Sequence, residues 1–562
     1  MTQVAEELIP GDVASRGNVP PTEKIESYAV PLPGAPTDQE LYSYFGPPMR
    51  WAFVWLFVAQ VSILYGYVMV MRRSPALWPG FILITFIFPP IVVNLWLRTR
   101  SHRTTLAEHK GKLAGWRAEN PELPNVDVFI PVCGEEDAVH RNTFLHVSRL
   151  EYGGNLNVYV LDDADLDRTR AASEDFGFHH VVRKNRGEWK KAGNLINAFD
   201  TTSGDYIVVF DADFSPRSDF LDHTLPYMDD PRIGVVQTAQ YFDFVGVNDM
   251  ARYAGALQEL FFRWIQPARD TYEAAIVAGT NLVYRRKAVE AAGGFAKVPL
   301  GEDVHSGVKL WVANYRTRYV PLALAKGLAP DNWDALTNQQ YRWCRSSMLL
   351  MVSKFFVDAP FSWRQRVCFW AAFLYYMASA ALLLTAALPT LVMIWFYPQQ
   401  VHWLNYVPLL PGLLSTFLVF PRLARGWDFR INRVCMVNST CHVLAVFDAL
   451  RNKVAAWVPT GAAVITVPKK GMSTPRKVKI LMRTWFLAIQ LLLWTGIARA
   501  MEGHDPWAYV PAALLGLTQL YLFGPFLVRS SLNRTKFPAP EEPPWRTSSE
   551  EENPLEPEWA EQ

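Results

Sequence analysis

Residues 206–213 read YIVVFDAD, an apolar run of strand length that leads directly into two carboxylates. Three similar apolar, β-branched runs are Val126–Val132, Leu156–Leu161 and Ile233–Gln237, and polar segments with helical spacing separate the four. This alternation is typical of an α/β unit with a mainly parallel sheet. Because such sheets bind ligands at the carboxyl ends of their strands, the acidic residues that follow these runs are candidates for a site.

Carboxylates follow three of these runs. Glu135 comes after the first, Asp163 after the second, and Asp211 and Asp213 after the third. An Asp-x-Asp pair suits a hard divalent cation, which prefers oxygen ligands and could bridge the diphosphate of a nucleotide sugar. A lone Asp-x-Asp is more often an acidic turn. Three acidic strand ends in succession favour a site.

Two further segments carry candidate groups. Lys191 begins the stretch KAGN (191–194), and a lysine at the start of a helix can contact a phosphate, although a solvated lysine is the ordinary alternative. Downstream, Glu302 and Asp303 follow Gly301. Either carboxylate could accept the proton of an attacking hydroxyl group. An acidic cap at a helix N-terminus explains the same pair equally well.

Residues 339–343 read QQYRW. Helical spacing would place Gln339, Arg342 and Trp343 on one face. Arginine can hold a diphosphate through two parallel hydrogen bonds, and the face of a tryptophan ring can stack on a sugar. The alternative is an amphipathic helix that lies along a membrane.

Long apolar runs flank the α/β unit. A helix needs about 20 apolar residues to cross the core of a bilayer. Half of the 562 residues are hydrophobic and the net charge is +2, so the composition indicates a membrane protein and gives no sign of a nucleic-acid partner. Six runs are predicted to span the membrane: Trp51–Met71, Trp78–Leu97, 369–397, 403–421, 479–500 and 507–528.

Basic residues favour one orientation of these runs. Arginine and lysine concentrate on the cytosolic side of membrane proteins. Arg72 and Arg73 would lie on the outer side, but four larger groups outweigh them if the α/β unit and both termini are cytosolic. These groups are Arg98–Arg103, Arg422–Arg433, Lys469–Lys479 and Arg529–Lys536. We therefore predict a multi-pass protein of the inner or plasma membrane.

The ordered set of candidate residues resembles a known signature. Asp163, Asp211-x-Asp213, Asp303 and Gln339-x-x-Arg342-Trp343 are similar to the D, DxD, D, QxxRW motifs of processive family 2 glycosyltransferases, which include cellulose, chitin, curdlan and hyaluronan synthases. The KAGN stretch, VQT (236–238), and Gly279-Thr280 followed by Arg285-Arg286 resemble stretches of bacterial cellulose synthase. The chain departs from the pattern at Gly301, where the family usually has threonine, and at 457–461 (WVPTG), where a gating loop is expected.

The resemblance implies a GT-A-like α/β fold, a UDP-sugar donor with Mg²⁺ or Mn²⁺, and inversion from an α-linked donor to a β-linked product. The family's roles at the donor would fall on Glu135 and Asp163 for the uridine, on Lys191 and Asp211 for the phosphates, and on Asp211 and Asp213 for the metal.

The remaining roles concern the acceptor and the chemistry. The resemblance makes Asp303 the general base. Gln339 and Arg342 would support the donor. Trp343 would stack on the acceptor sugar at the mouth of a membrane channel, with Glu302 nearby.

The expected architecture is an α/β GT-A-like cytosolic domain inserted in a multi-span helical membrane domain. The predicted parts are a flexible cytosolic tail (1–47), a transmembrane hairpin (48–103), the glycosyltransferase domain (104–350), interfacial helices with a four-span channel region (351–530), and a disordered cytosolic tail (531–562). One interfacial helix is expected within residues 430–460.

The leading hypothesis is a processive synthase that polymerises a β-glycan, a cellulose-like β-glucan above all, and passes it across the membrane. Its expected partners are the UDP-sugar, the growing polysaccharide and membrane lipid, with an accessory export subunit left open. Alternatives are a chitin-, hyaluronan- or curdlan-type synthase and a non-processive transferase that glucosylates a lipid. A transporter is a further alternative, which the few charges within the spans disfavour. A polysaccharide-binding scaffold is another, which the complete acidic set disfavours.

Overall fold

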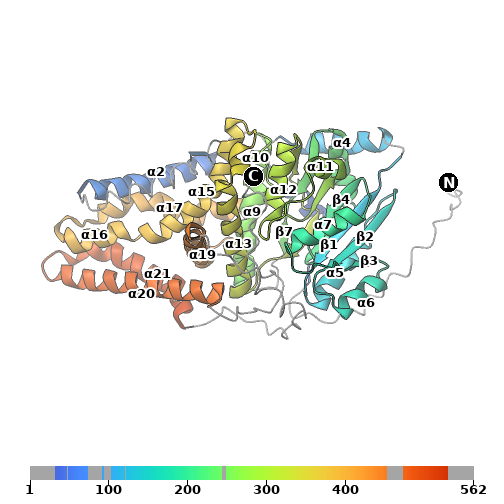
Figure 1. Ribbon diagram of the computed structural model, residues 1–562. Coiled ribbons are helices and arrows are strands. Elements are labelled where there is room, and N and C mark those ends of the chain that lie inside the picture. Colours follow the sequence, from blue (N-terminus) through green and yellow to red (C-terminus); the bar gives the residue numbers. More distant parts are fainter. Residues whose placement is uncertain are drawn as a thin grey trace, which may run out of the picture.

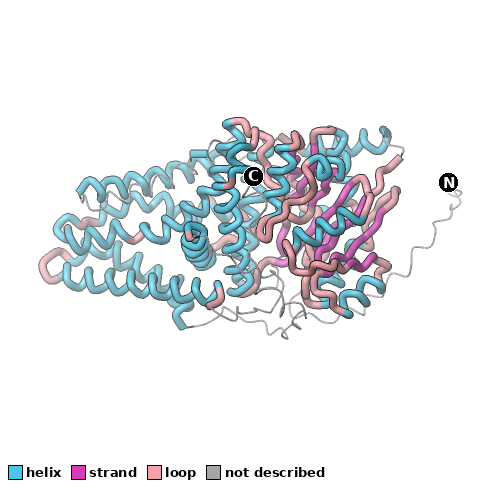
Figure 2. The backbone as a smooth tube through the Cα atoms, viewed as in Figure 1, coloured by secondary structure: helices cyan, strands magenta, loops and turns pink. Residues whose placement is uncertain are grey.

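A computed structural model describes residues 32–46, 49–73, 92–93, 96, 103–119, 122–243, 248–451 and 472–528. The chain forms a mixed α/β domain and a bundle of long helices, which lie at opposite ends of the molecule (Figure 1). Figure 2 shows the strands gathered in the α/β domain, while the other end consists of helices joined by loops.

The larger sheet has seven strands in the order β3-β2-β1-β4-β8-β6-β9. Its strands are β1 (Val126–Val132), β2 (Leu156–Asp162), β3 (His179–Val181), β4 (Tyr206–Val209), β6 (Ile233–Thr238), β8 (Leu282–Arg285) and β9 (Arg316–Val320). β1 pairs in parallel with β2 and β4, and β6 pairs in parallel with β9. The predicted α/β, mainly parallel sheet is therefore confirmed. β8, which the sequence did not indicate, runs antiparallel between β4 and β6.

Helices cover both faces of this sheet. Alternate residues of a strand point to opposite faces. In β1, Val128 and Ile130 therefore join a core that includes Phe144 of α5, whereas Phe129 joins a second core that includes Leu195 of α7. The helices of the domain are α4 (Leu106–Glu119), α5 (Asp137–Val147), α6 (Asp167–Asp175), α7 (Lys191–Thr201), α8 (Phe220–Thr224), α9 (Asp249–Leu260), α10 (Gln266–Asp270), α11 (Arg286–Ala291) and α12 (Glu302–Val312), with one-turn helices η3 (Leu225–Asp229) and η4 (Phe261–Ile265).

A smaller sheet has the order β5-β10-β7. Its strands are β5 (Phe214–Pro216), β10 (Ala325–Leu328) and β7 (Tyr241–Asp243). β5 begins directly after Asp213, so this sheet fixes the chain on the far side of the Asp-x-Asp turn.

The N-terminal segment 32–46 packs against this smaller sheet. Its short helix α1 (Asp38–Leu41) carries Glu40, whose carboxylate accepts a hydrogen bond from Lys326 Nζ of β10 at 3.0 Å. Leu41 and Tyr44 are buried. The prediction of a flexible tail is therefore wrong for these residues, because an apolar pair and an ion pair hold them in place. Residues 1–31 lie outside the described part of the chain.

The bundle contains helices that could cross a membrane. Five are long and apolar enough among the described residues: Arg50–Arg73, Trp363–Phe396, Trp403–Leu423, Thr474–Met501 and Pro506–Leu527. The first and fourth are the single helices α2 and α20. The second consists of α15 (Trp363–Thr385) and α16 (Leu388–Phe396), the third of η6 (Trp403–Leu409), α17 (Leu410–Leu418) and α18 (Phe420–Leu423), and the fifth of η8 (Pro506–Tyr509) and most of α21 (Val510–Val528). Five of the six predicted spans are thereby found. The other, Trp78–Leu97, lies almost entirely outside the described residues. Large apolar side chains such as Trp51, Leu414 and Leu491 are exposed on the flanks, as expected of a surface that contacts lipid.

Two helices connect the bundle with the α/β domain (Figure 1). They are α13 (Trp333–Val352) and α19 (Asn432–Leu450). The remaining short helices of the C-terminal part of the chain are α14 (Lys354–Asp358), η5 (Pro398–Gln400) and η7 (Phe429–Ile431). The two helices pack against each other, and Tyr341 OH donates a hydrogen bond to Asp448 Oδ2 at 2.9 Å. α13, α15 and α20 pack against α19, which lies in the segment where an interfacial helix is predicted, and its position relative to a membrane stays a prediction.

A buried ion pair closes the amino-terminal edge of the larger sheet. Asp127 Oδ2 of β1 accepts hydrogen bonds from Gly204 N at 2.6 Å and from Arg286 Nη2 at 3.1 Å. Arg286 also donates to the carbonyl oxygens of Gly204, at 2.5 Å, and Phe199, at 2.9 Å. Both charges are buried and have hydrogen-bond partners, which is the condition under which a buried pair is tolerated.

Replacing Arg286 with alanine should destabilise the protein by about 3–5 kcal/mol, because the Asp127 carboxylate would remain buried without its cation. The measurement is the midpoint of thermal unfolding of the purified protein in detergent. Lys287→Ala, at the exposed neighbouring position, is the matched control. Equal midpoints for the two variants would contradict this account of the edge.

Candidate functional site

Lys191 joins two loops at the carboxyl edge of the larger sheet. It is the first residue of α7, as the sequence predicted. Its Nζ donates to Asp211 Oδ1 and, at 2.8 Å, to the carbonyl oxygen of Gly279. Thr280 Oγ1 accepts a hydrogen bond from Asp211 N at 2.9 Å. The turn after β4 is thus held from both sides, with its carboxylates at the edge of the sheet.

Asp163 is held from behind by Arg183, a residue that no sequence motif indicated. The Arg183 guanidinium lies 2.8 Å from Asp163 Oδ1, and its Nε also donates to Asn194 Oδ1 at 2.8 Å. Burial raises the pKa of Asp163, and Arg183 opposes that rise. A Cβ atom at Gly193 would lie 2.4 Å from Arg183 Nη1 and 2.2 Å from the Glu188 carbonyl oxygen, so only glycine fits there.

The KAGN stretch is therefore explained by local contacts. Its lysine reaches Asp211, its glycine leaves room for Arg183, and its asparagine fixes the N-terminal turn of α7 to β2. This last contact is a hydrogen bond from Asn194 Nδ2 to the Leu161 carbonyl oxygen at 3.0 Å.

Glu135 and Asp213 are acidic groups in an environment that disfavours their charge. Burial, together with the neighbouring carboxylates of Asp162 and Asp211, raises the pKa of Glu135 to about 7. Burial, together with Asp211 and Glu135, raises the pKa of Asp213 to about 7. The negative charges of Glu135, Asp211 and Asp213 therefore disfavour one another, and a cation would stabilise them.

Asp162, the first acid of the adjacent pair, serves the backbone. Its two carboxylate oxygens accept hydrogen bonds from Ala164 N at 2.9 Å and from Leu166 N at 3.0 Å. Asp163 is thereby singled out as the member of the pair that faces the site.

Glu302 and Asp303 begin α12 and approach the same crevice. Asp303 Oδ2 would lie 3.1 Å from a Cβ atom placed on Gly279, the residue whose carbonyl oxygen Lys191 contacts. Burial, and then the Glu302 carboxylate, raise the pKa of Asp303 to about 7. Burial alone would lower the pKa of Lys191, but Asp211, Glu302 and Asp303 raise it.

Gly301 explains how α12 can start so close to α13. Its φ of +67° is left-handed, and a Cβ atom there would lie 1.8 Å from Ser346 Oγ of α13. Ser346 Oγ donates in turn to the Leu300 carbonyl oxygen at 3.2 Å. The departure from the family's threonine is thus matched by a close contact between two helices.

The QQYRW stretch lies on α13, the helix that faces the site from the bundle side. Burial lowers the pKa of Arg342, and the carboxylates of Glu302, Asp211 and Asp303 counteract this effect. Arg342 is therefore close enough to these carboxylates to interact with them electrostatically. Gln339, which is buried, and Trp343, which is half-buried, lie within one turn of it.

The other stretches that the resemblance indicated divide between two edges of the sheet. Gln237 of the VQT stretch anchors the turn before β8, because its side chain accepts from Ala278 N at 2.7 Å and donates to the Thr280 carbonyl oxygen at 2.8 Å. Arg285 and Arg286 lie at the opposite edge, since Arg285 pairs with Tyr206 at the start of β4. This arginine pair therefore lies away from the carboxyl edge that holds the acidic crevice.

The donor set fits a hard divalent cation. Asp211 and Asp213 offer carboxylate oxygens, which Mg²⁺ and Mn²⁺ accept, and their mutual repulsion would be relieved by a positive ion. Within the described ranges, no group of three or more His, Cys, Asp or Glu side chains is placed to hold a metal ion. The remaining ligands would therefore come from a bound diphosphate and water.

Gly193→Ala should weaken UDP binding about tenfold or more, because the added methyl group displaces Arg183 and with it Asp163. Calorimetric titration of the purified protein with UDP measures this loss. Gly111→Ala is the control, since a Cβ atom at Gly111 meets nothing within 4 Å. Unchanged affinity in the Gly193 variant would show that this clamp does not support a nucleotide site.

Comparison with known proteins agrees with this geometry. Residues 206–419 match the family model described as glycosyl transferase family group 2. The chain is 30% identical over 326 residues to cellulose synthase 1 of Komagataeibacter xylinus, covering 55% of this chain and 21% of that protein. It is 31% identical over 322 residues to a cellulose synthase catalytic subunit (UDP-forming) of Pseudomonas fluorescens, covering 55% of this chain and 43% of that protein. It thus spans less than half the length of these relatives.

A solved mannosyltransferase from Pyrobaculum calidifontis, in complex with GDP-Man and Mn²⁺, aligns with 65% of this chain and 99% of its own, at a TM-score of 0.45 and 18% identity. The family match covers β4, the Asp-x-Asp turn, α12 and α13, whereas Glu135, Asp163 and Lys191 lie before it in the chain. Residues 206–419 are therefore similar to glycosyl transferase family group 2, and the mixed sheet of the α/β domain is GT-A-like.

Proposed function

We propose that this chain is a membrane-embedded, inverting glycosyltransferase that extends a β-glycan from a UDP-sugar, with a cellulose-like β-glucan as the product. One observation carries the proposal: Lys191 Nζ contacts Asp211 Oδ1 and the carbonyl oxygen of Gly279, the residue beside which Asp303 lies. Arg342, from a different element, interacts electrostatically with the same carboxylates. Two cations beside a carboxylate cluster suit a nucleotide diphosphate with its metal ion, next to a base for the acceptor. The UDP-forming relatives support UDP as the leaving group.

The donor would enter at the carboxyl edge of the sheet. Glu135 and Asp163 would contact the uridine, and Arg183 keeps Asp163 in place for that role. Lys191 and Arg342 would face the diphosphate, whose negative charge they are placed to balance. When bound at Asp211 and Asp213, Mg²⁺ or Mn²⁺ would neutralise further charge on the leaving diphosphate.

Asp303 would act as the general base. A hydroxyl oxygen of the acceptor sugar attacks the anomeric carbon of the donor, and its proton passes to the Asp303 carboxylate. The new glycosidic bond forms as the bond to the diphosphate breaks, so UDP leaves and the configuration inverts. A carboxyl group with a pKa of about 7 suits proton transfer at neutral pH. The reaction needs no covalent intermediate, because positioning and charge stabilisation suffice.

The acceptor would approach along α13. Trp343 would stack on its terminal sugar, with Glu302 beside it and Gln339 supporting the donor. α13 also packs on α19, which is enclosed by the bundle. A polymer extended at this site could therefore pass directly into a path between the membrane helices. An accessory export subunit would continue that path.

The α/β domain would lie in the cytosol. The ends of the membrane helices that face this domain carry Arg422, Arg425 and Arg433, together with Arg476 and Lys477. The opposite ends carry fewer basic residues, among them Arg72 and Arg73. This asymmetry is the one that places the more basic side inside the cell.

Asp303→Asn should lower sugar transfer by about 10²–10⁴-fold, because the amide cannot accept the acceptor proton. UDP binding should persist, since Asp303 is not proposed to contact the nucleotide. Incorporation of radiolabel from UDP-glucose by purified protein with Mg²⁺ or Mn²⁺ measures transfer. Asp358→Asn, at an exposed carboxylate that ends α14, is the matched control. Undiminished transfer in the Asp303 variant would contradict the assignment of Asp303 as the general base.

The product separates the candidate functions. With UDP-glucose, we expect a high-mass polymer that a β-1,4- or β-1,3-glucanase digests, whereas UDP-N-acetylglucosamine should give little incorporation. Incorporation from the amino sugar alone would move the chain to the chitin or hyaluronan type. Label that partitions with lipids would instead indicate a lipid glucosyltransferase and would overturn the polymerase proposal.

A further inference from the structure

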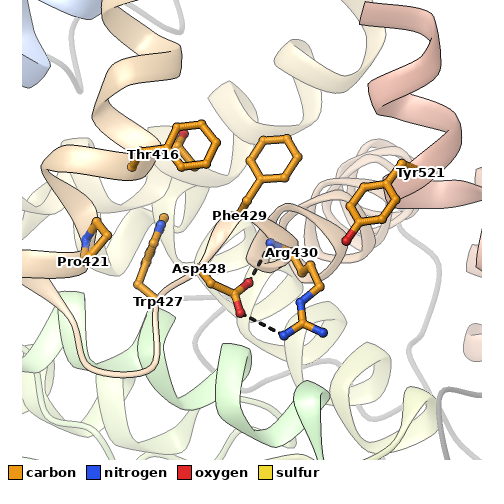
Figure 3. A pocket seen from close by; sticks show the side chains of 8 residues that line it. Thr416, Pro421, Trp427, Asp428, Phe429, Arg430 and Tyr521 are labelled. Carbon is orange, nitrogen blue, oxygen red and sulfur yellow. Dashed lines mark hydrogen bonds and ion pairs between the residues drawn. The ribbon is translucent and has the colours of Figure 1, made fainter.

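A pocket lies outside the catalytic crevice, on the flank of the bundle near the α/β domain. It has a volume of about 430 Å³, and its walls include Phe417, Trp427, Phe429, Arg430 and Tyr521. Figure 3 shows Pro421 and Trp427 on one side of the pocket and Tyr521 on the other, with Phe429 and Arg430 between them. The walls thus come from the end of the α17–α18 helix, the loop that follows it, and α21.

The pocket lies where the candidate membrane-spanning helices meet the α/β domain. The loop from Arg425 to Arg430 touches α9 of the α/β domain, since Arg252 Nε donates to the Gly426 carbonyl oxygen at 2.8 Å and Tyr253 OH donates to Asp428 Oδ2 at 2.9 Å. The pocket therefore has membrane-spanning helices on one side and the cytosolic domain on the other. A bilayer around the candidate spans would place its headgroups at this depth.

Its aromatic walls open toward the lipid. Phe417 is 53% exposed and Tyr521 is 58% exposed. From these residues two exposed apolar stripes follow their helices into the bilayer, Leu410 and Leu414 on α17 and Leu514 and Leu517 on α21. The spacing of three to four residues keeps each stripe on one face. Acyl chains could lie along these stripes while a headgroup occupies the pocket.

A polar group inside the pocket lacks an acceptor. The Trp427 Nε1 atom is buried and has no hydrogen-bond partner in the described part of the chain. The ring is held by stacking on Phe420, with centroids 4.4 Å apart and planes 12° apart. Because a buried N–H group is normally paired, this donor indicates a ligand with an acceptor oxygen.

The surrounding charge favours an anion. Arg430 pairs with Asp428 and Asp249, at 3.1 Å and 3.3 Å. Arg433, beside the pocket, donates to the carbonyl oxygens of Leu522, at 3.0 Å, and Tyr521, at 3.2 Å, and has no carboxylate partner among the described residues. Arg422, next to Pro421 in the chain, donates to the carbonyl oxygen of Leu418. Asp428 lies in the pocket wall with Arg430, so the positive charge comes from the arginines beside the pocket.

We propose that this pocket binds an anionic glycerophospholipid of the cytosolic leaflet. A phosphate oxygen of the headgroup accepts the hydrogen bond of Trp427 Nε1 and lies beside Arg430, and the acyl chains follow α17 and α21. The site is separate from the catalytic crevice and depends only on insertion of the bundle in a membrane.

Native mass spectrometry of the purified full-length protein in detergent tests the proposal, with phosphatidylglycerol as the probe. The wild-type protein should retain this lipid, and Trp427→Phe should weaken its retention about tenfold, because the ring remains but the charge-assisted hydrogen bond is lost. Trp507→Phe, at an exposed tryptophan at the other end of the α21 span, should bind as the wild type does. Phosphatidylcholine should bind more weakly than phosphatidylglycerol.

A second variant guards against a folding defect in the first. Phe417→Ala removes an exposed wall, so it should fold normally and still weaken retention. Unfolding midpoints equal to that of the wild type check the fold of each variant. The proposal fails if the wild type retains no phosphatidylglycerol, or if both variants bind as tightly as the Trp507 control. It also fails if inorganic phosphate displaces the lipid, because the pocket would then recognise free phosphate.

Discussion

Like charges crowd together at the carboxyl edge of the larger sheet, and their repulsion governs the design of the site. Glu135, Asp211, Asp213 and Asp303 come from three separate parts of the chain, yet they meet in one partly buried crevice. Such a cluster is stable only if cations balance it. Lys191 supplies one from the start of α7, and a nucleotide-bound metal ion would supply another. The same residues therefore hold the free protein together and prepare it for its ligand.

The helix α13 makes this balance depend on the membrane half of the protein. Arg342 faces the crevice, while Tyr341, its neighbour, donates to Asp448 of α19. Successive residues of one helix thus serve the catalytic edge and the bundle. In the proposed function, a rigid element shared in this way would keep the reacting end of a polymer in register with the helices that conduct it. The α/β domain and the helical bundle therefore form one structure that shares α13, and the α/β domain is not a separate soluble attachment.

Much of this could be predicted from the sequence, because strand-length apolar runs ending in acids are local patterns. β1, β2, β4 and β6 and the acidic edge they share were found in this way. β8 escaped notice since its four residues resemble no isolated run, and Arg183 and Ser346 were missed because their partners lie far away in sequence. The position of Arg285 and Arg286 could not be predicted, because a motif does not reveal at which end of an antiparallel strand it falls. Residues 32–46 have the composition of a tail, but Leu41 and Tyr44 find a surface on which to pack.

Gly301 and Ser346 must evolve together. A threonine at 301 would need a Cβ atom 1.8 Å from Ser346 Oγ and a left-handed backbone, so it could return only after the serine had shrunk and the turn had taken another path. Each residue therefore limits the substitutions that the other position can accept, although two strands separate α12 and α13 in the chain. A chimera that takes the start of α12 from a threonine-bearing relative would also need the facing segment of α13 from that relative, so the two segments have to be exchanged together.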